Sequence, residues 1–99
     1  MPASAAAPAG FDPDRGWRLH PQVALRPEPF GALLYHFGTR KLSFLKNRTI
    51  VAVIESLPDH PDIAAALGAA GVAQADQGPY RHALGVLVES QMLVPREDL

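Results

Sequence analysis

The sequence predicts an α+β domain of winged-helix-like type, in which a three-stranded antiparallel sheet is followed by three helices. Strand-like patterns occupy the chain up to residue 45, and helical periodicity begins after residue 47. Strands grouped before helices are typical of α+β domains, whose helices pack on one face or end of the sheet. With 99 residues the chain has enough material for one domain with a modest core.

The first 16 residues predict a flexible N-terminal tail, followed by one domain over residues 17–99. The tail consists mostly of Ala, Pro, Gly and Asp, with Phe11 as its aromatic residue. Such a segment buries too little apolar surface to offset the entropy lost on ordering. Phe11 could dock on a partner, although we favour no role for it.

Three strands are expected between residues 23 and 45. Val23–Arg26 alternates as a half-buried strand does, and Pro27-Glu28-Pro29 should stop it. Residues 32–37 are nearly continuously apolar, which predicts a central strand covered on most of both faces. Gly38 should supply the positive φ of a tight turn before the third strand, Leu42–Leu45. The short connections favour a meander with the second strand in the middle.

Three helices are expected after the strands. Asn47 is a good N-cap for the first, which Pro58 should end. The second should start within Asp59–Asp62, at a capping Asp or His followed by proline, and end at Gly71. The third should start within residues 76–79 and run to about Met92.

Several stretches of the chain closely resemble the mycofactocin biosynthesis peptide chaperones, the MftB family. The resemblance covers residues 17–93, and the long run RPEPFGALLYHF makes it specific. The stretches that carry it are Trp17–Leu19, Val23–Phe37, Leu42–Lys46, Ile50–Val53, Gly71-Val72 and Tyr80–Leu84.

The resemblance implies the fold predicted above and a role in peptide recognition, as in the related chaperone of pyrroloquinoline quinone biosynthesis. It implies that a ribosomally made precursor peptide binds as an added strand between the third strand and the third helix. It also implies delivery to a radical S-adenosylmethionine maturase that works on the C-terminal Val-Tyr of the precursor.

The open edge of the third strand is therefore the candidate peptide-binding site. An unpaired strand edge is usually covered or blunted, and the lysines at both ends of this one could simply prevent aggregation. Gly85 could allow close approach of a peptide or serve as a packing notch, which we slightly favour. Arg40, Lys41, Lys46 and Arg48 could be a solvated rim or could steer an acidic partner. The predicted peptide-binding residues are Lys41, Leu42, Ser43, Phe44, Leu45, Lys46, Arg81, Leu84, Gly85 and Val88.

Other chemistry has little support in the sequence. There is no cysteine, the four histidines are scattered, and no phosphate-binding loop is present, so we expect no metal, no cofactor and no catalysis by this chain alone. A net charge of −1 and a weakly basic third helix disfavour a winged-helix nucleic-acid binder. A module that dimerises through the third strand remains an alternative. No apolar run is long enough to span a bilayer, and we expect a cytoplasmic protein with no membrane partner.

The aromatic residues of the sheet region are interpreted as core. They are Phe30, Tyr35, Phe37 and Phe44.

Overall fold

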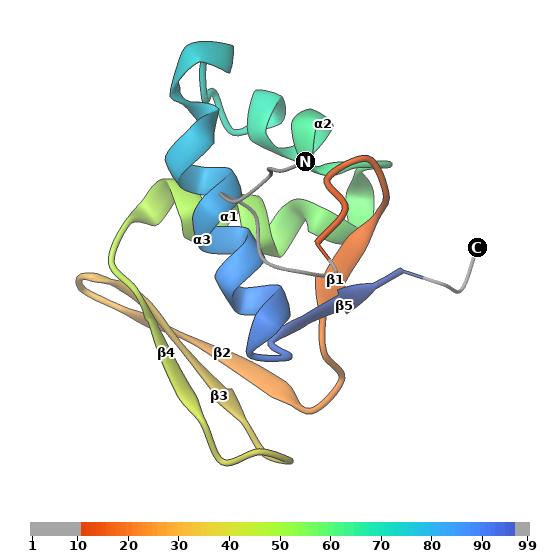
Figure 1. Cartoon of the computed structure of the whole chain (residues 1–99). Coiled ribbons are helices and arrows are strands. Elements are labelled where there is room, and N and C mark those ends of the chain that lie inside the picture. Colours follow the sequence, from red (N-terminus) through yellow and green to blue (C-terminus); the bar gives the residue numbers. More distant parts are fainter. Residues whose placement is uncertain (1–10, 97–99) are drawn as a thin grey trace.

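The computed structural model describes residues 11–96 and confirms the α+β prediction, with a three-stranded antiparallel sheet followed by three helices (Figure 1). The arrangement is compatible with a winged-helix-like fold. Two further strands form a small second sheet. The elements are β1 (Trp17–Leu19), β2 (Val23–Glu28), β3 (Gly31–His36), β4 (Leu42–Leu45), α1 (Arg48–Ser56), α2 (Ile63–Ala69), α3 (Gln77–Glu89) and β5 (Leu93–Pro95), with 3₁₀ turns at Leu57–Asp59 and Gln74–Asp76.

The larger sheet has the order β2-β3-β4, so the expected meander with the second strand in the middle is confirmed. The prediction that β2 stops before Pro27 is wrong, because β2 continues through Glu28. The Phe37 amide donates to the Gln22 carbonyl (2.8 Å), and hydrogen-bonded pairs alternate along an antiparallel ladder. By this alternation the nitrogen of Pro27 faces away from β3, so the ladder loses no hydrogen bond there.

The central strand is buried on one face. Ala32, Leu34 and His36 are buried, whereas Leu33 and Tyr35 between them are partly exposed. The expectation of a strand covered on both faces is therefore wrong.

The interpretation of the sheet aromatics as core is wrong too. Phe30, Phe37 and Phe44 are 44%, 58% and 59% exposed, and Tyr35 is partly exposed. An apolar run fits a doubly covered strand or a singly covered strand with an apolar outer face, and the run alone does not distinguish them.

The turn between β3 and β4 uses Arg40, with φ of 66°, as its left-handed residue, and Gly38 lies outside the positive-φ region. Side-chain hydrogen bonds explain this difference. The Nδ1 atom of His36 accepts from the amides of Gly38 (3.0 Å) and Thr39 (3.1 Å), and the Arg40 amide donates to the His36 carbonyl (2.8 Å). The buried imidazole thus sets the turn conformation.

The small sheet joins the two ends of the described chain, because β1 pairs antiparallel with β5 from Trp17 opposite Pro95 to Leu19 opposite Leu93. Residues just before β1 also pack on the domain. The Trp17 indole N–H donates to the Asp12 carbonyl (2.8 Å), and the Phe11 ring lies 5.7 Å from the Trp17 ring. Phe11 and Asp12, which we expected to belong to a flexible tail, therefore contact the domain, and residues 1–10 of that expected tail lie outside the described residues.

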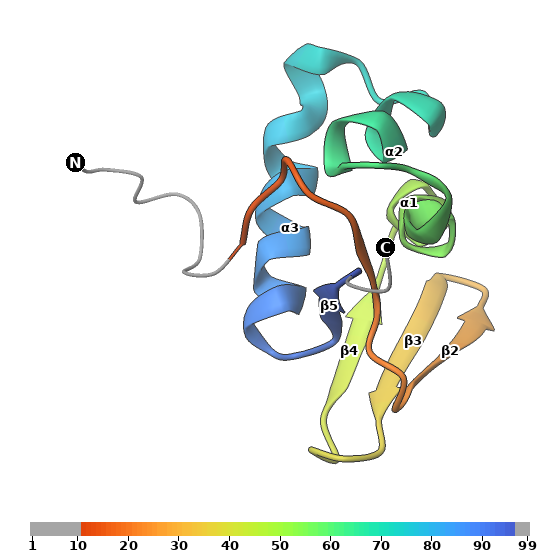
Figure 2. The ribbon, with the colours of Figure 1, turned by 90° about the vertical axis from the view of Figure 1, so that its right-hand side faces the viewer.

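The helices gather at one end of the larger sheet and enclose the core with it (Figures 1 and 2). As expected, Asn47 caps α1, its Oδ1 accepting from the amides of Thr49 (2.7 Å) and Ile50 (3.2 Å). The cap of α2 is Asp62, one residue after Pro61, and Gly71 ends that helix with φ of 85°. Of the helices in residues 11–96, none is long and apolar enough to cross a membrane.

His20 lies where the two sheets meet. Its amide donates to the Met92 carbonyl (2.9 Å), its Nδ1 accepts from the Gln22 amide (2.9 Å), and its ring lies 4.5 Å from the His36 ring. Partial burial lowers the pKa of His20 below the usual 6.5, and the nearby His36 and Arg18 disfavour the charged imidazole further. The junction therefore favours the neutral form of His20.

This junction predicts a pH dependence of stability. Because the pKa of His20 is lower in the folded than in the unfolded chain, the unfolded chain binds more protons as pH falls below about 6.5, and stability is lost in that direction. In His20→Asn the side-chain oxygen can still accept from the Gln22 amide without titrating. The fall in thermal midpoint between pH 7.5 and 5.5 should be smaller in the variant than in the parent protein. Equal falls in the two proteins would contradict the prediction.

Candidate functional site

The free edge of β4 presents unpaired backbone groups. The His36 amide donates to the Lys41 carbonyl (3.0 Å), which makes these two residues a hydrogen-bonded pair of the β3–β4 ladder. Because such pairs alternate, the backbone groups of Ser43 and Leu45 face β3, whereas those of Leu42 and Phe44 face away from it. Within the described chain no strand pairs with this side of β4. Leu42 and Phe44 therefore each offer one N–H and one C=O to an incoming strand.

The other edge of the sheet is less able to accept a strand. On β2 the outward positions include Pro27, which has no N–H to donate. The outward positions of β4 contain no proline. The two edges of the sheet thus differ. Every outward-facing residue of β4 has an N–H to donate, whereas β2 lacks one at Pro27.

Gly31 holds the register that produces this edge. It begins β3 with φ of 150°, and a Cβ atom at this position would overlap the carbonyl oxygen of Leu45. The end of β4 therefore approaches the start of β3 more closely than any other residue type would allow. A shift of one residue in this pairing would turn the backbone N–H and C=O groups of Leu42 and Phe44 toward β3, so they would no longer face the open edge.

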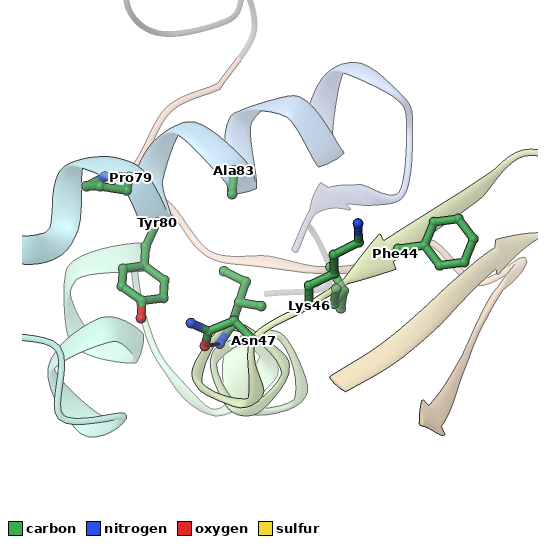
Figure 3. Close-up of a pocket in the computed structure, with 8 residues that line it drawn as sticks. Phe44, Lys46, Asn47, Pro79, Tyr80 and Ala83 are labelled. Atoms are coloured by element: carbon green, nitrogen blue, oxygen red, sulfur yellow. Dashed lines mark hydrogen bonds between the residues drawn. The ribbon is translucent and has the colours of Figure 1, made fainter. Parts of the chain in front are cut away.

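A groove lies beside the edge, between β4 and α3. It consists of two cavities of about 370 and 300 Å³ that share Phe44, Leu45 and Ala83. In Figure 3, Tyr80 projects from α3 toward Asn47, and the Lys46 side chain points up toward α3. The complete lining, which we call the β4–α3 groove, is Ser43, Phe44, Leu45, Lys46, Asn47, Ile50, Pro79, Tyr80, Ala83, Val86 and Leu87.

The β4–α3 groove is mainly apolar, with polar groups near its β4 end. Val86 is 44% exposed and forms part of the α3 wall, which makes it one of the few large apolar side chains open to solvent. Lys46 is exposed at the groove, and the Asn47 side chain is engaged in capping α1. Such a surface suits apolar side chains of an extended peptide, with Lys46 available to a carboxylate.

The predicted site residues on β4 lie as expected around this edge. Ser43, Phe44, Leu45 and Lys46 line the groove, and Leu42 supplies outward backbone groups. Lys41 is exposed immediately before β4, where its carbonyl accepts from His36, and it does not line the groove.

The predicted residues on α3 lie outside the groove lining. Leu84 is fully buried in the core and Gly85 is buried, so both lie behind the wall. Val88 is half-buried against the core, and Arg81 donates to the Gln77 side chain (3.0 Å). The α3 residues that line the groove instead are Pro79, Tyr80, Ala83, Val86 and Leu87.

The predicted α3 residues differ from those that line the groove because they lie on a neighbouring face of the helix. Each residue turns the helix by about 100°, so an error of one position moves a side chain to a neighbouring face. The stripe of Tyr80, Leu84, Leu87 and Val88 mixes core and groove positions, and their shared apolar character hides the boundary. Contact between a peptide and Arg81, Leu84, Gly85 or Val88 stays a prediction.

The site offers backbone hydrogen bonds and apolar contacts, which are the means of binding an extended chain. Over the part of the chain that is described, no three His, Asp or Glu side chains come close enough together to hold a metal ion.

An open strand edge that faces a helix across an apolar groove defines a class of small α+β domains suited to binding a peptide by strand addition. Comparison with known proteins identifies the particular family. Residues 16–94 match the model of the peptide chaperone MftB family, and the chain belongs to this family.

Curated relatives are named peptide chaperone MftB, and this chain is similar to them along most of their length. The chain is 73% identical over 97 residues to "Peptide chaperone MftB" of Mycobacterium ulcerans, which covers 97% of this chain and 89% of the relative. It is 75% identical over 87 residues to the protein of that name in Mycobacterium tuberculosis (88% and 80% covered), and 70% over 95 residues to that of Mycolicibacterium smegmatis (96% and 93%). No solved structure gives a significant match.

The close approach at Gly31 predicts a large effect of a single methyl group. Gly31→Ala should lower the free energy of unfolding by about 2–4 kcal/mol, because the new Cβ meets the Leu45 carbonyl and alanine disfavours this φ. Gly68→Ala, in α2, is the matched control, because a Cβ atom there meets no atom within 4 Å. It should raise the free energy of unfolding by about 0.4–1 kcal/mol. Urea unfolding measures both. Equal effects of the two substitutions would contradict the assigned role of Gly31.

Proposed function

We propose that this chain binds a short, ribosomally made precursor peptide as an additional strand on β4 and presents it to a radical S-adenosylmethionine maturase. The observation that carries the proposal is the pair of outward-facing residues Leu42 and Phe44 next to the β4–α3 groove. The name of the relatives, peptide chaperone, supports the same activity.

The hydrogen bonds of the edge are too few to account for tight binding. Leu42 and Phe44 offer two donors and two acceptors, and four backbone hydrogen bonds contribute about 2–6 kcal/mol in all. Ordering a disordered peptide costs about 2–5 kcal/mol or more. The groove must supply the remainder, and each apolar side chain buried there can add about 1.5–3 kcal/mol. The edge therefore aligns the peptide alongside β4, and the groove supplies affinity and sequence preference.

The resemblance to the mycofactocin chaperones supports a more specific partner. In that pathway the precursor ends in Val-Tyr, and the maturase modifies this dipeptide. On this proposal the chain acts in the cytoplasm without a cofactor of its own, and the chemistry belongs to the maturase. The groove leaves the bound peptide open to solvent on one side, as delivery to another protein requires.

A proline scan of β4 tests strand addition. Leu42→Pro removes an outward-facing N–H, and it should weaken binding of the precursor peptide about tenfold without loss of fold. Leu42→Ala is the matched control, since it removes the side chain and keeps the N–H. Ser43→Pro removes a bond to β3 and should lower the unfolding free energy instead. Isothermal titration calorimetry and urea unfolding separate these effects. If Leu42→Pro and Leu42→Ala bind the peptide equally well, strand addition at this edge is refuted.

A substitution that fills the groove tests the contribution of side-chain contacts. Ala83 is exposed and lines both cavities, so Ala83→Phe should occupy the groove without disturbing the core. We expect peptide affinity to fall at least about tenfold, because the apolar side chains of the peptide lose their place. Glu89→Phe, on an exposed α3 position outside the lining, is the control for adding an aromatic residue to α3. Unchanged affinity in Ala83→Phe would show that the peptide binds elsewhere.

A further inference from the structure

The face of the larger sheet that points away from the core is apolar and open to solvent. Leu33 lies opposite Phe44, and Tyr35 lies opposite Leu42, with all four side chains on this face. Ring contacts extend the surface at both ends, from Phe44 to Phe30 (6.2 Å) and from Tyr35 to Phe37 (5.1 Å). We call these six residues the outer face.

Most of the exposed large apolar side chains of the described chain lie there. Among residues 11–96, five large apolar side chains are exposed, and four of them belong to the outer face: Phe30, Phe37, Leu42 and Phe44. The fifth, Val86, belongs to the groove. Contiguous apolar patches of this kind on a folded domain mark interaction sites.

The outer face has a basic border. Residues 22–48 contain five of the nine Lys and Arg residues but one of the ten Asp and Glu residues, a formal charge of +4 in a chain of net charge −1. The acidic residue, Glu28, pairs with Arg26 (2.7 Å). Of the remaining cations, Arg40 and Lys41 lie in the turn next to Phe37, and Arg48 reaches the Pro29 carbonyl beside Phe30 (3.4 Å). Positive charge therefore stands at both ends of the apolar strip.

This charge distribution argues against a second copy of the chain as the occupant. A two-fold symmetric pairing through the outer face would place two basic borders against each other, and like charges across an interface are unfavourable. A protein surface with an apolar centre and an acidic border would complement both features.

Phe44 connects the outer face with the peptide site. Its backbone faces the open edge, the residue belongs to the lining of both groove cavities, and its side chain lies beside that of Leu33 on the outer face. An occupant of the outer face would therefore lie directly beside a peptide in the groove. A protein that receives the peptide must bind close to it, and the outer face meets this requirement. A membrane surface has no such reason to lie beside the peptide.

We propose that the outer face is a second docking surface, for a folded protein partner with an apolar patch and an acidic border. This inference rests on the proposed function, in which the partner is the maturase that receives the peptide. The chain then binds its two partners on adjacent surfaces and holds both in one complex.

Two matched substitutions separate the two surfaces. Phe37→Ser removes an exposed aromatic ring from the outer face, away from the groove and from the outward-facing groups of β4. The purified maturase should bind this variant at least about tenfold more weakly than the parent, while affinity for the precursor peptide stays within about twofold. Val86→Ser removes an exposed apolar side chain from the groove and should give the opposite result. Isothermal titration calorimetry of each variant with each partner alone measures all four affinities.

A charge variant tests the basic border independently. Arg40→Asp reverses the charge next to Phe37, and Asp tolerates the left-handed backbone at this position. It should lower the rate constant for association with the maturase and make that rate constant less dependent on salt concentration. Urea unfolding of Phe37→Ser and Arg40→Asp should remain close to that of the parent, which excludes misfolding as the cause.

Each other outcome overturns the proposal. Unchanged maturase affinity in both Phe37→Ser and Arg40→Asp would refute the docking surface. A parent protein that does not bind the maturase would refute it as well. Binding of the parent to phosphatidylglycerol vesicles that Phe37→Ser abolishes would assign the face to a membrane. Self-association of the parent that Phe37→Ser abolishes would assign it to a second copy. A failure of peptide binding, on which the proposed function rests, is distinct, because it appears as a parent protein that binds the maturase and does not bind the peptide.

Discussion

The register between β3 and β4 is the constraint on which the rest of the structure depends. Gly31 lets the end of β4 approach the start of β3, and the His36–Lys41 hydrogen bond fixes the phase of the ladder at the other end. That phase turns the backbone of Leu42 and Phe44 toward the open edge and their side chains toward the outer face. The neighbouring residues Ser43 and Leu45 bind β3 and face the interior. A single backbone alignment thus produces the edge, one wall of the groove and the apolar surface beside it.

Local signals in the sequence were sufficient for most of the architecture. The three strands of the larger sheet, their order and the caps at Asn47 and Gly71 follow from periodicity and residue preference, and the structure contains them. The pairing of β1 with β5 was not predictable in this way. Three-residue strands show no useful alternation, and this pair joins segments more than 70 residues apart in the chain. Local sequence carries little information on such a contact.

The groove was harder to predict than the edge, for a physical reason. The residues from Leu42 to Lys46 could be identified because a terminal strand must leave one edge open. On α3, apolar side chains face both the core and the groove, so Leu84 and Ala83 look equally suited to either place. The aromatic residues of the sheet posed the same difficulty. Hydrophobic character predicts that a side chain will be covered, and it does not say whether its own chain or a partner covers it.

The pairing of β1 with β5 has a mechanical consequence. Trp17 lies opposite Pro95, so β1 begins at the same end of the two-stranded ladder at which β5 ends. A force that pulls the two ends of the chain apart would load the hydrogen bonds of this ladder one after another, starting at that end. Antiparallel strands opened in this direction resist far less than strands sheared along their length, because only one bond bears the load at a time. The β1–β5 ladder should therefore open before the β2–β3–β4 sheet bears the load.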